Sequence, residues 1–237
     1  MKKRINTGIP GFDDLLNGGF LEGSITLISG PPGIGKSTMA MQYIYKGIVE
    51  NDEPGVFLTT ENNIDEVISY ADAFGWDFNK YMEEQKLEIL DRSVFEAADM
   101  DLGLDFGIMK DIIAKVKAKR AVLDSVTLFN YMFRDDTSRR FHMLRFIDLM
   151  KKHNCTTLMT SDQEKNFPNI KYSEEHFLSD GLIFLFWNRH QAENERCIWA
   201  AKLKGSTIDT NIRPIEIADK GVIVYPEKTP LISLDVL

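Results

Sequence analysis

The sequence predicts an α/β fold in which a mostly parallel sheet is flanked by helices and continues into an antiparallel C-terminal strand extension. Short apolar segments alternate with segments of helical periodicity through residues 24–180. A glycine-rich loop joins the first apolar segment to a helix, and four strand-like segments with short breaks occupy residues 181–226. Alternation of strands and helices is typical of parallel sheets, whereas short connections permit hairpins.

The elements are assigned in chain order from their periodicity. Apolar runs predict parallel strands at Ile25–Ser29, Val56–Thr60, Leu87–Leu90, Arg120–Asp124 and Thr156–Thr160. Helical spacing predicts helices at Lys36–Glu50, Ile64–Phe74, Gly107–Lys119 and Thr137–His153. The antiparallel strands are expected at Leu182–Trp187, Arg196–Leu203, Ile215–Ile217 and Val222–Tyr225.

Two patterns predict which side chains of residues 129–153 face the core. In the helix at 137–153, the apolar residues at helical spacing are Phe141, Leu144, Ile147 and Leu149. We expect this stripe to pack against the sheet. Upstream, every second residue of 129–133 is aromatic (Phe129, Tyr131 and Phe133), as core-facing positions of a strand would be.

Length and composition favour one intracellular domain. A chain of 237 residues, 43% of them hydrophobic, can bury one sizeable core. We expect a lead-in at 1–23, a parallel core at 24–180, an antiparallel edge at 181–226 and a tail at 227–237. Cys155 and Cys197 make no disulfide framework and are expected to be small buried hydrophobes. The basic start lacks an apolar leader and no stretch is long enough to span a bilayer, so a cytoplasmic location is expected.

The segment from Gly30 to Ser37, Gly-Pro-Pro-Gly-Ile-Gly-Lys-Ser, carries the functional prediction. It fits the G-x-x-x-x-G-K-[ST] pattern and lies between a predicted strand and a predicted helix, the context that a phosphate loop requires. Its glycines permit close backbone approach, and successive N–H groups at a helix N-terminus form an anion nest. We expect nucleotide contacts from Gly30, Pro31, Pro32, Gly33, Ile34, Gly35, Lys36, Ser37 and Thr38.

Four polar side chains suit phosphate chemistry. Lys36 can reach the β- and γ-phosphates of a nucleotide, and the Ser37 hydroxyl can ligate Mg²⁺. Asp124 ends an apolar strand, which suits a carboxylate associated with that Mg²⁺, although an Asp there can also cap a helix or turn. Glu61 follows another strand and could orient and deprotonate the water that attacks the γ-phosphate, with a solvated loop acid as the alternative.

Further segments resemble the KaiC-like branch of the RecA-superfamily ATPases. The first is the lead-in from Arg4 to Gly23. The others follow in family order and are Gly55-Val-Phe-Leu-Thr-Thr-Glu-Asn62, Phe74-Gly-Trp-Asp77, Val122-Leu-Asp-Ser125, Phe177-Leu-Ser-Asp-Gly181 and Lys202-Leu-Lys-Gly205. The resemblance covers residues 4 to 226. It implies a RecA-like P-loop core that binds ATP and Mg²⁺ and typically forms hexameric rings with ATP at the subunit interfaces.

The resemblance also implies roles for individual residues. The family's Lys-Leu-Arg/Lys-Gly motif projects cations into the next subunit's site, and Lys202 and Lys204 occupy those positions, with a solvated strand face as the alternative. Two adjacent glutamates follow the second core strand in the family, whereas here Glu61 is followed by Asn62. A polar sensor of the γ-phosphate corresponds to Asp162, which is equally compatible with an ordinary loop residue.

Two departures from the family pattern argue against autokinase activity. Some family members phosphorylate adjacent Ser and Thr residues just before the Asp-Gly strand. The matching positions here are His176 and Phe177, which lack hydroxyls. Several KaiC proteins also carry two such domains in tandem, whereas this sequence contains one.

Three functional hypotheses remain open. The first is a slow Mg-dependent ATPase acting at the interfaces of a homo-oligomeric ring and coupled to a conformational or signalling change read by a protein partner. The second is a nucleotide-binding assembly scaffold with little turnover. The third is a DNA-repair ATPase, which the net charge of −8 opposes, as it opposes a membrane surface. The best nucleic-acid candidate is the cluster Arg139, Arg140 and Arg145, which a salt-bridged, solvated helix face explains better.

Overall fold

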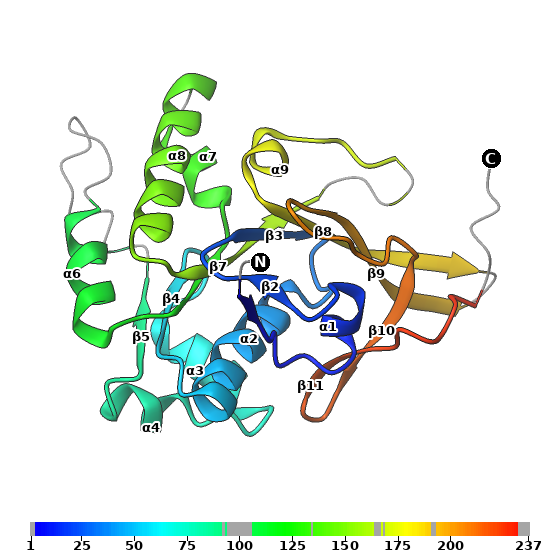
Figure 1. Cartoon of the computed structure of the whole chain (residues 1–237), viewed down its shortest axis with the longest axis horizontal. Helices are drawn as coiled ribbons and strands as arrows, with labels where there is room; N and C mark the ends of the chain where they lie inside the picture. The colour runs from blue at the N-terminus through cyan, green and yellow to red at the C-terminus, as the bar shows by residue number, and fades with distance from the viewer. Residues whose placement is uncertain are drawn as a thin grey trace.

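The computed structural model describes residues 3–91, 93, 106–133, 135–163, 167, 169–190 and 193–231 (Figure 1). The main strands are β3 (Ile25–Gly30), β4 (Gly55–Thr59), β5 (Leu87–Leu90), β6 (Arg120–Asp124), β7 (Thr156–Asp162), β8 (Gly181–His190), β9 (Glu193–Leu203), β10 (Arg213–Ala218) and β11 (Gly221–Val224). The helices are α1 (Phe12–Leu15), α2 (Lys36–Asn51), α3 (Ile64–Asp72), α4 (Phe78–Glu83), α6 (Gly107–Val116), α7 (Thr127–Met132), α8 (Asp136–Lys152) and α9 (Glu174–Leu178).

These strands form one nine-stranded sheet with the order β11-β10-β9-β8-β3-β7-β6-β4-β5. β5, β4, β6, β7, β3 and β8 pair in parallel, and β9, β10 and β11 continue the sheet in antiparallel pairs. The mixed topology predicted from the sequence is confirmed. The parallel part extends one strand beyond residue 180, because β8 pairs in parallel with β3. The carboxyl ends of β3, β4, β6 and β7 therefore meet at one edge of the sheet.

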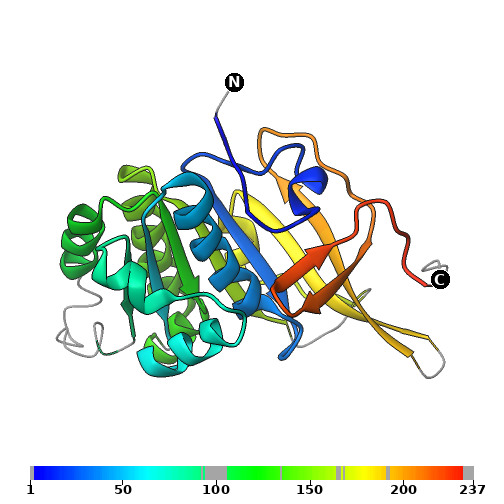
Figure 2. The same ribbon diagram turned by 90° about the horizontal axis from the view of Figure 1, so that it is seen from below.

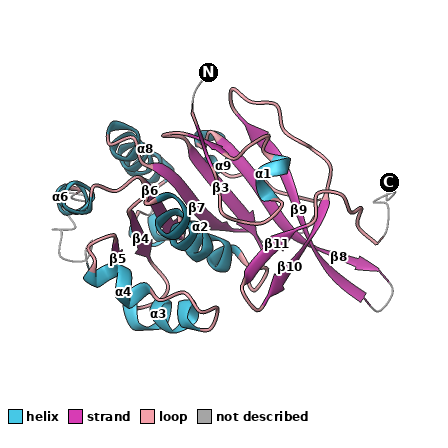
Figure 3. Cartoon of the chain, turned by 60° about the horizontal axis from the view of Figure 1, so that its bottom comes forward, coloured by secondary structure: helices cyan, strands magenta, loops and turns pink. Residues whose placement is uncertain are grey.

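Helices cover both faces of the parallel part of the sheet (Figures 2 and 3), and β3, β4 and β6 are buried on both sides. One core contains side chains of α2, α3 and α4 packed on Ile28, Phe57 and Val122. The other contains side chains of α6, α7 and α8 packed on residues of the same strands that point the opposite way, such as Leu27 and Leu123. This arrangement explains the continuous apolar runs from which the parallel strands were predicted. Cys155 and Cys197 are free and buried, as expected.

The N-terminal lead-in and the C-terminal β10–β11 hairpin pack on α2 from two sides. In the lead-in, β1 (Arg4–Ile5) pairs antiparallel with β2 (Phe20–Leu21). The Phe20 ring makes an edge contact with that of Tyr43 in α2, at 5.6 Å between ring centroids. On the other side, the Gln42 side-chain amide donates to Val222 O at 3.1 Å and accepts from Val222 N at 2.6 Å. The β10–β11 hairpin is thereby attached to the helix that begins at the phosphate loop.

Three details of residues 127–237 differ from the sequence prediction. Residues 129–133 belong to α7 and its C-cap instead of a strand, because alternation over five residues cannot be distinguished from i, i+4 helical spacing. α8 exists, but its buried face is His142, Met143, Phe146, Ile147 and Met150. Phe141 and Leu144 are exposed, since the His142 ring stacks on Phe133 and Phe146 packs near Phe129. Much of the expected tail, 232–237, lies outside the described residues. Within the described part, no helix combines the length and the apolar character needed to cross a membrane.

Arg120, at the start of β6, is a fully buried cation that joins four parts of the chain. Its guanidinium donates to Glu53 Oε2 at 2.8 Å, to Tyr43 O at 2.9 Å and to Asn6 O at 2.8 Å. It also lies over the Tyr43 ring, 4.6 Å from the centroid. A Cβ on Gly47 would overlap it, at 2.2 Å from Arg120 Nε. A buried charge is tolerated only when it is paired and hydrogen-bonded, and here both conditions are met.

We expect Arg120→Ala to lower the free energy of unfolding by about 3–5 kcal/mol, because Glu53 and two carbonyls would lose their buried partner. Urea denaturation followed by circular dichroism measures this change. The matched control is Lys115→Ala, which breaks the surface pair with Glu88 (3.3 Å) and should cost no more than about 1 kcal/mol. An equal decrease in the free energy of unfolding of the two variants would show that the buried network stabilises the fold no more than a surface pair does.

Candidate active site

The phosphate loop connects the carboxyl end of β3 to the N-terminus of α2. Gly33 and Gly35 have positive φ values of 73° and 117°, which a side chain would strain. Gly35 is the N-cap of the 16-residue helix α2, and no side chain caps that helix. The first N–H groups of a helix have no intrahelical partner, so those of α2 are available to an anion. The helix dipole also favours negative charge at this end.

Two close approaches hold the loop in place. A Cβ on Gly30 would lie 2.5 Å from the backbone oxygen of Leu185 in β8, so only glycine fits there. A Cβ on Gly35 would lie 3.0 Å from Ile217 Cδ1 in β10. The antiparallel extension therefore supports the loop on one side, while β8 supports its beginning.

The Lys36 side chain lies over its own loop. Its Nζ donates to Gly30 O at 2.9 Å and to Pro31 O at 3.1 Å, and it lies 2.9 Å from Asp162 Oδ1. Asp162 is the last residue of β7, and its side chain is 43% exposed, whereas that of Lys36 is 9% exposed. A phosphate entering the loop would compete with these three oxygens for the ammonium group. Asp162 thus lies beside the phosphate loop, at the position expected for it.

Asp124 ends β6 next to the start of α2. Its carboxylate accepts hydrogen bonds from the hydroxyls of Thr160 and Ser37. Burial raises the pKa of Asp124, and the charge of Glu61 acts in the same direction, while the two hydroxyls and Lys36 partly offset them. A cation bound here would favour the ionised carboxylate. The structure therefore brings Ser37 and Asp124 together, as the sequence analysis expected of a Mg²⁺ site.

Glu61 lies in the loop after β4, where two hydroxyls orient its carboxylate. Ser125 Oγ donates to Glu61 Oε1 at 2.9 Å, and Thr127 Oγ1 donates to the same oxygen at 3.3 Å. The loop is tied to the end of β6, because Thr60 N donates to Asp124 O at 2.8 Å. Glu61 is exposed. The two hydroxyls thus fix the direction of this carboxylate, and it remains open to a water molecule. A solvated loop acid would be equally open to water, but nothing would fix its direction.

The residues at this edge fit a magnesium nucleotide. The loop offers free N–H groups and a lysine for phosphates, and a hydroxyl and a carboxylate are hard oxygen ligands of the kind that Mg²⁺ prefers. No group of three or more His, Cys, Asp or Glu side chains could hold a metal ion in the described part of the chain. Mg²⁺ usually keeps several waters and binds through one or two protein oxygens plus substrate phosphates, so the small donor set suits it.

Comparison with known proteins gives the family. The family model described as "ATPase: KaiC" matches residues 5–229. The chain belongs to the KaiC ATPase family. It is 34% identical over 232 residues to the circadian clock oscillator protein KaiC of Synechococcus elongatus. This match covers 94% of this chain but only 44% of that protein. It is 31% identical to a UPF0273 protein of Sulfurisphaera tokodaii, covering 95% of this chain and 83% of that one.

A solved structure agrees with the sequence relatives. The KaiC-like protein PH0186 of Pyrococcus horikoshii superimposes with a TM-score of 0.83 at 32% identity, covering 95% of this chain and all of that one. This confirms the RecA-like fold of a KaiC-family ATPase domain that the resemblance implied. The chain spans less than half the length of the curated KaiC relatives.

The two lysines of the KaiC-like Lys-Leu-Lys-Gly motif lie far from this chain's own phosphate loop. Lys202 is in the last part of β9 and Lys204 follows it, and Leu203 pairs with Gly181 at the start of β8. Gly181 in turn pairs with Thr26, near the start of β3, whereas the loop begins at Gly30. Four residues of β3 separate Thr26 from Gly30, and at about 3.3 Å per residue this places the lysine motif more than about 13 Å from the start of the loop. Neither lysine therefore reaches the phosphate loop of its own chain.

His176 and Phe177, the two positions that argued against autokinase activity, differ in exposure. His176, in α9, is buried, and its Nδ1 accepts from the Ser173 backbone N–H at 2.8 Å. Phe177 is 67% exposed. Burial lowers the pKa of His176, and the neighbouring Glu175 charge opposes that shift. The ring is a structural part of the α9 capping box.

Sequence reasoning missed the hydroxyls that orient the two carboxylates. Thr160 holds Asp124, while Ser125 and Thr127 hold Glu61. Thr160 and Ser125 were visible as polar residues at the carboxyl ends of predicted strands, which is a usable signal. Thr127 gave no signal, because its contact with Glu61 depends on how the loop after β6 turns into α7.

We expect Asp162→Asn to bind ATP about fivefold more tightly than the wild type, since removing this half-exposed carboxylate frees Lys36 from a competing charge. Isothermal titration calorimetry with Mg-ATP measures the affinity. The matched control is Glu50→Gln, which removes a carboxylate of the same exposure (43%) that pairs with Lys46, and its affinity should equal that of the wild type. Weaker binding in Asp162→Asn would show that the carboxylate helps to hold the nucleotide.

Proposed function

We propose that this chain binds Mg-ATP and hydrolyses it slowly at the subunit interfaces of a homo-oligomeric ring, for which six subunits are favoured. Hydrolysis would drive a conformational or signalling change that a protein partner reads. The proposal rests on the chain's membership of the KaiC ATPase family together with the geometry of the site. Autokinase activity is not part of it, because the corresponding positions are His176 and Phe177.

The observation that carries hydrolysis is the orientation of Glu61. The loop N–H groups and Lys36 hold the phosphates, and Ser37, backed by Asp124, would ligate Mg²⁺, which supplies charge neutralisation at the β- and γ-phosphates. Glu61 lies beside Ser125 at the same edge, with one carboxylate oxygen fixed by two hydroxyls. Such a carboxylate can orient a water molecule and accept its proton.

The location of Lys202 and Lys204 supports an interface site. Both lie at the end of the sheet away from the phosphate loop, and both are partly exposed. In a head-to-tail ring each subunit presents this end to its neighbour, so the lysines would reach the neighbour's phosphates. There they would stabilise transition-state charge as an arginine finger does, an effect worth about 10³–10⁵ in rate in the best cases.

We expect Glu61→Gln to lower kcat at least about a hundredfold while leaving ATP affinity and assembly unchanged, because the amide cannot accept the proton. A coupled phosphate-release assay and calorimetry measure the two properties. Asp65→Asn, an exposed carboxylate in the first turn of α3, is the control and should retain the wild-type rate. An unchanged rate in Glu61→Gln would refute the role of Glu61, and loss of ATP binding would show that it is structural.

We expect Mg-ATP to convert the chain into a ring near six subunits. We expect the ring to release phosphate, since Lys202 and Lys204 would act only on the nucleotide of a neighbouring subunit. Size-exclusion chromatography with light scattering, with and without Mg-ATP and with phosphate assayed in the same fractions, measures both properties. A monomer that binds ATP but releases none would support the scaffold hypothesis and make Lys202 and Lys204 surface residues. Stimulation by single-stranded DNA that weakens steeply with salt would support the DNA-repair hypothesis.

A further inference from the structure

Asp180, immediately before β8, connects the lysine motif to the start of the central strand. Its backbone N–H donates to Ile25 O at 2.8 Å, and its backbone oxygen accepts from Lys204 N at 2.8 Å. Its Oδ2 accepts from Ile25 N at 3.1 Å. The residue therefore fixes the backbone from which the Lys204 side chain projects, and it fixes this backbone against the strand that leads to the phosphate loop.

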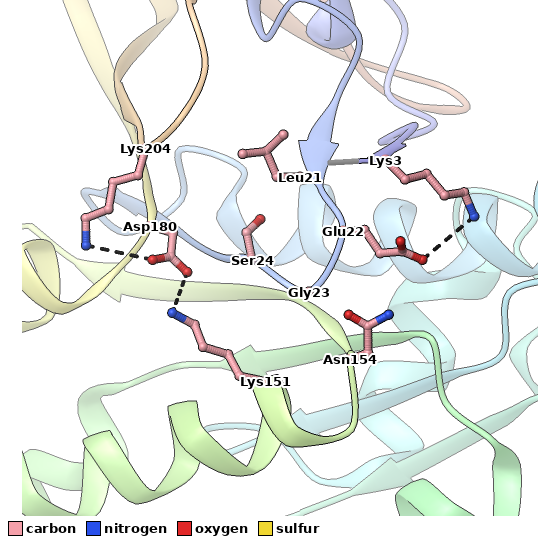
Figure 4. Close-up of a pocket in the computed structure, with 9 residues that line it drawn as sticks. All are labelled: Lys3, Leu21, Glu22, Gly23, Ser24, Lys151, Asn154, Asp180 and Lys204. Atoms are coloured by element: carbon pink, nitrogen blue, oxygen red, sulfur yellow. Dashed lines mark ion pairs between the residues drawn. The ribbon is translucent and has the colours of Figure 1, made fainter. Parts of the chain in front are cut away.

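The carboxylate of Asp180 also lies between two lysines (Figure 4). Lys151 Nζ is 2.8 Å from Oδ2, and Lys204 Nζ is 3.7 Å from Oδ1. All three side chains line a pocket of about 420 Å³ at this end of the sheet. The Asp180 side chain is 18% exposed, whereas that of Lys204 is 53% exposed. A largely buried carboxylate, that of Asp180, thus faces the more exposed ammonium group of Lys204.

Asp180 is held in its charged form. Burial raises its pKa, but the hydrogen bonds from Lys151 and from the Ile25 N–H, together with the charges of Lys151 and Lys204, outweigh burial, and the pKa is lowered. At neutral pH the carboxylate therefore attracts both ammonium groups. Lys151 occupies one of its oxygens, which leaves the other facing Lys204.

We propose that Asp180 is a positioning residue that orients Lys204 toward the phosphates bound by the neighbouring subunit. This inference rests on the proposed function. Lysine is a point charge on a flexible four-carbon stem, so an unguided Lys204 would sample many rotamers. At 3.7 Å the carboxylate restricts that sampling without a direct hydrogen bond, and the ammonium can still transfer to a phosphate. Lys202 needs no such help, because its Nζ donates to His176 O at 2.7 Å.

The test is the turnover of Asp180→Asn. The amide oxygen can still accept from Ile25 N, and both backbone hydrogen bonds remain, so the change removes mainly the charge. We expect kcat to fall at least about tenfold, since misplacing a reacting group by about 1 Å can cost about a hundredfold. KM for ATP should stay within about twofold, because the phosphate loop is untouched. Combining Asp180→Asn with Lys204→Ala should give the same kcat as Lys204→Ala alone.

Mixing subunits separates positioning from a general structural effect. Glu61→Gln subunits are expected to have little turnover of their own, but they carry intact Asp180 and Lys204. Co-assembled with Asp180→Asn subunits, they should raise phosphate release above the sum of the separate preparations, because an intact lysine then reaches the Asp180→Asn site. The matched control is Glu22→Gln, which removes a carboxylate from the same pocket that pairs with Lys3 at 3.8 Å and should leave kcat unchanged.

Three results would overturn the inference: wild-type kcat in Asp180→Asn, a defect that Glu61→Gln subunits do not relieve, or a double variant slower than Lys204→Ala. Absence of phosphate release by the wild-type chain would instead overturn the proposed function, and the two failures are therefore distinguishable. If circular dichroism shows Asp180→Asn to be unfolded, Asp180→Glu takes its place. It keeps the charge but moves it by one methylene, and it should show a smaller defect that mixing also relieves.

Discussion

The structure is arranged around backbone N–H groups at the N-terminus of α2 that no side chain caps. An anion is the natural partner for them, and neighbouring elements hold the loop that presents them. β8 approaches so closely that position 30 must be glycine, and Ile217 of β10 restricts position 35. Lys36 lies over the loop and contacts its carbonyls and Asp162. The parallel sheet then adds carboxylates from β4 and β6, because their carboxyl ends meet at the same edge.

The direction of the strands also explains why the lysine motif lies away from the phosphate loop. β9 runs antiparallel to β8, so its last residues return to the amino-terminal end of the central strands. The chain therefore carries a phosphate loop at one end of β3 and lysines at the other, joined through Ile25 and Asp180. An arrangement with two different, complementary ends is what a heterologous, ring-closing interface needs. The buried Arg120 network fixes the lead-in, α2 and β6 to one another, and so holds both ends in register.

Much of the fold could be predicted from local sequence, and the exceptions have physical causes. The strands buried on both faces form continuous apolar runs, and the phosphate loop has a motif, so both were recognised. The alternating aromatic residues at 129–133 resembled a strand where α7 lies, since five residues contain too little periodicity to distinguish the two. The buried face of α8 was misplaced because His142 stacks on Phe133, a contact that hydrophobicity does not reveal. Thr127 and Asp180 were missed as partners for the same reason: their contacts are set by tertiary structure, not by spacing.

The described side chains at the site carry more negative than positive charge before any nucleotide binds. Among the described side chains named at the carboxyl edge, Asp124, Asp162 and Glu61 oppose a single cation, Lys36. A triphosphate adds further negative charge, and the charge of Glu61 already raises the pKa of Asp124. In the proposed function, Mg²⁺ and lysines from a neighbouring subunit would supply the missing positive charge. Asn62, in place of a second glutamate, reduces that requirement by one charge. Nucleotide binding and assembly are for this reason expected to be coupled: each supplies charge that the other lacks.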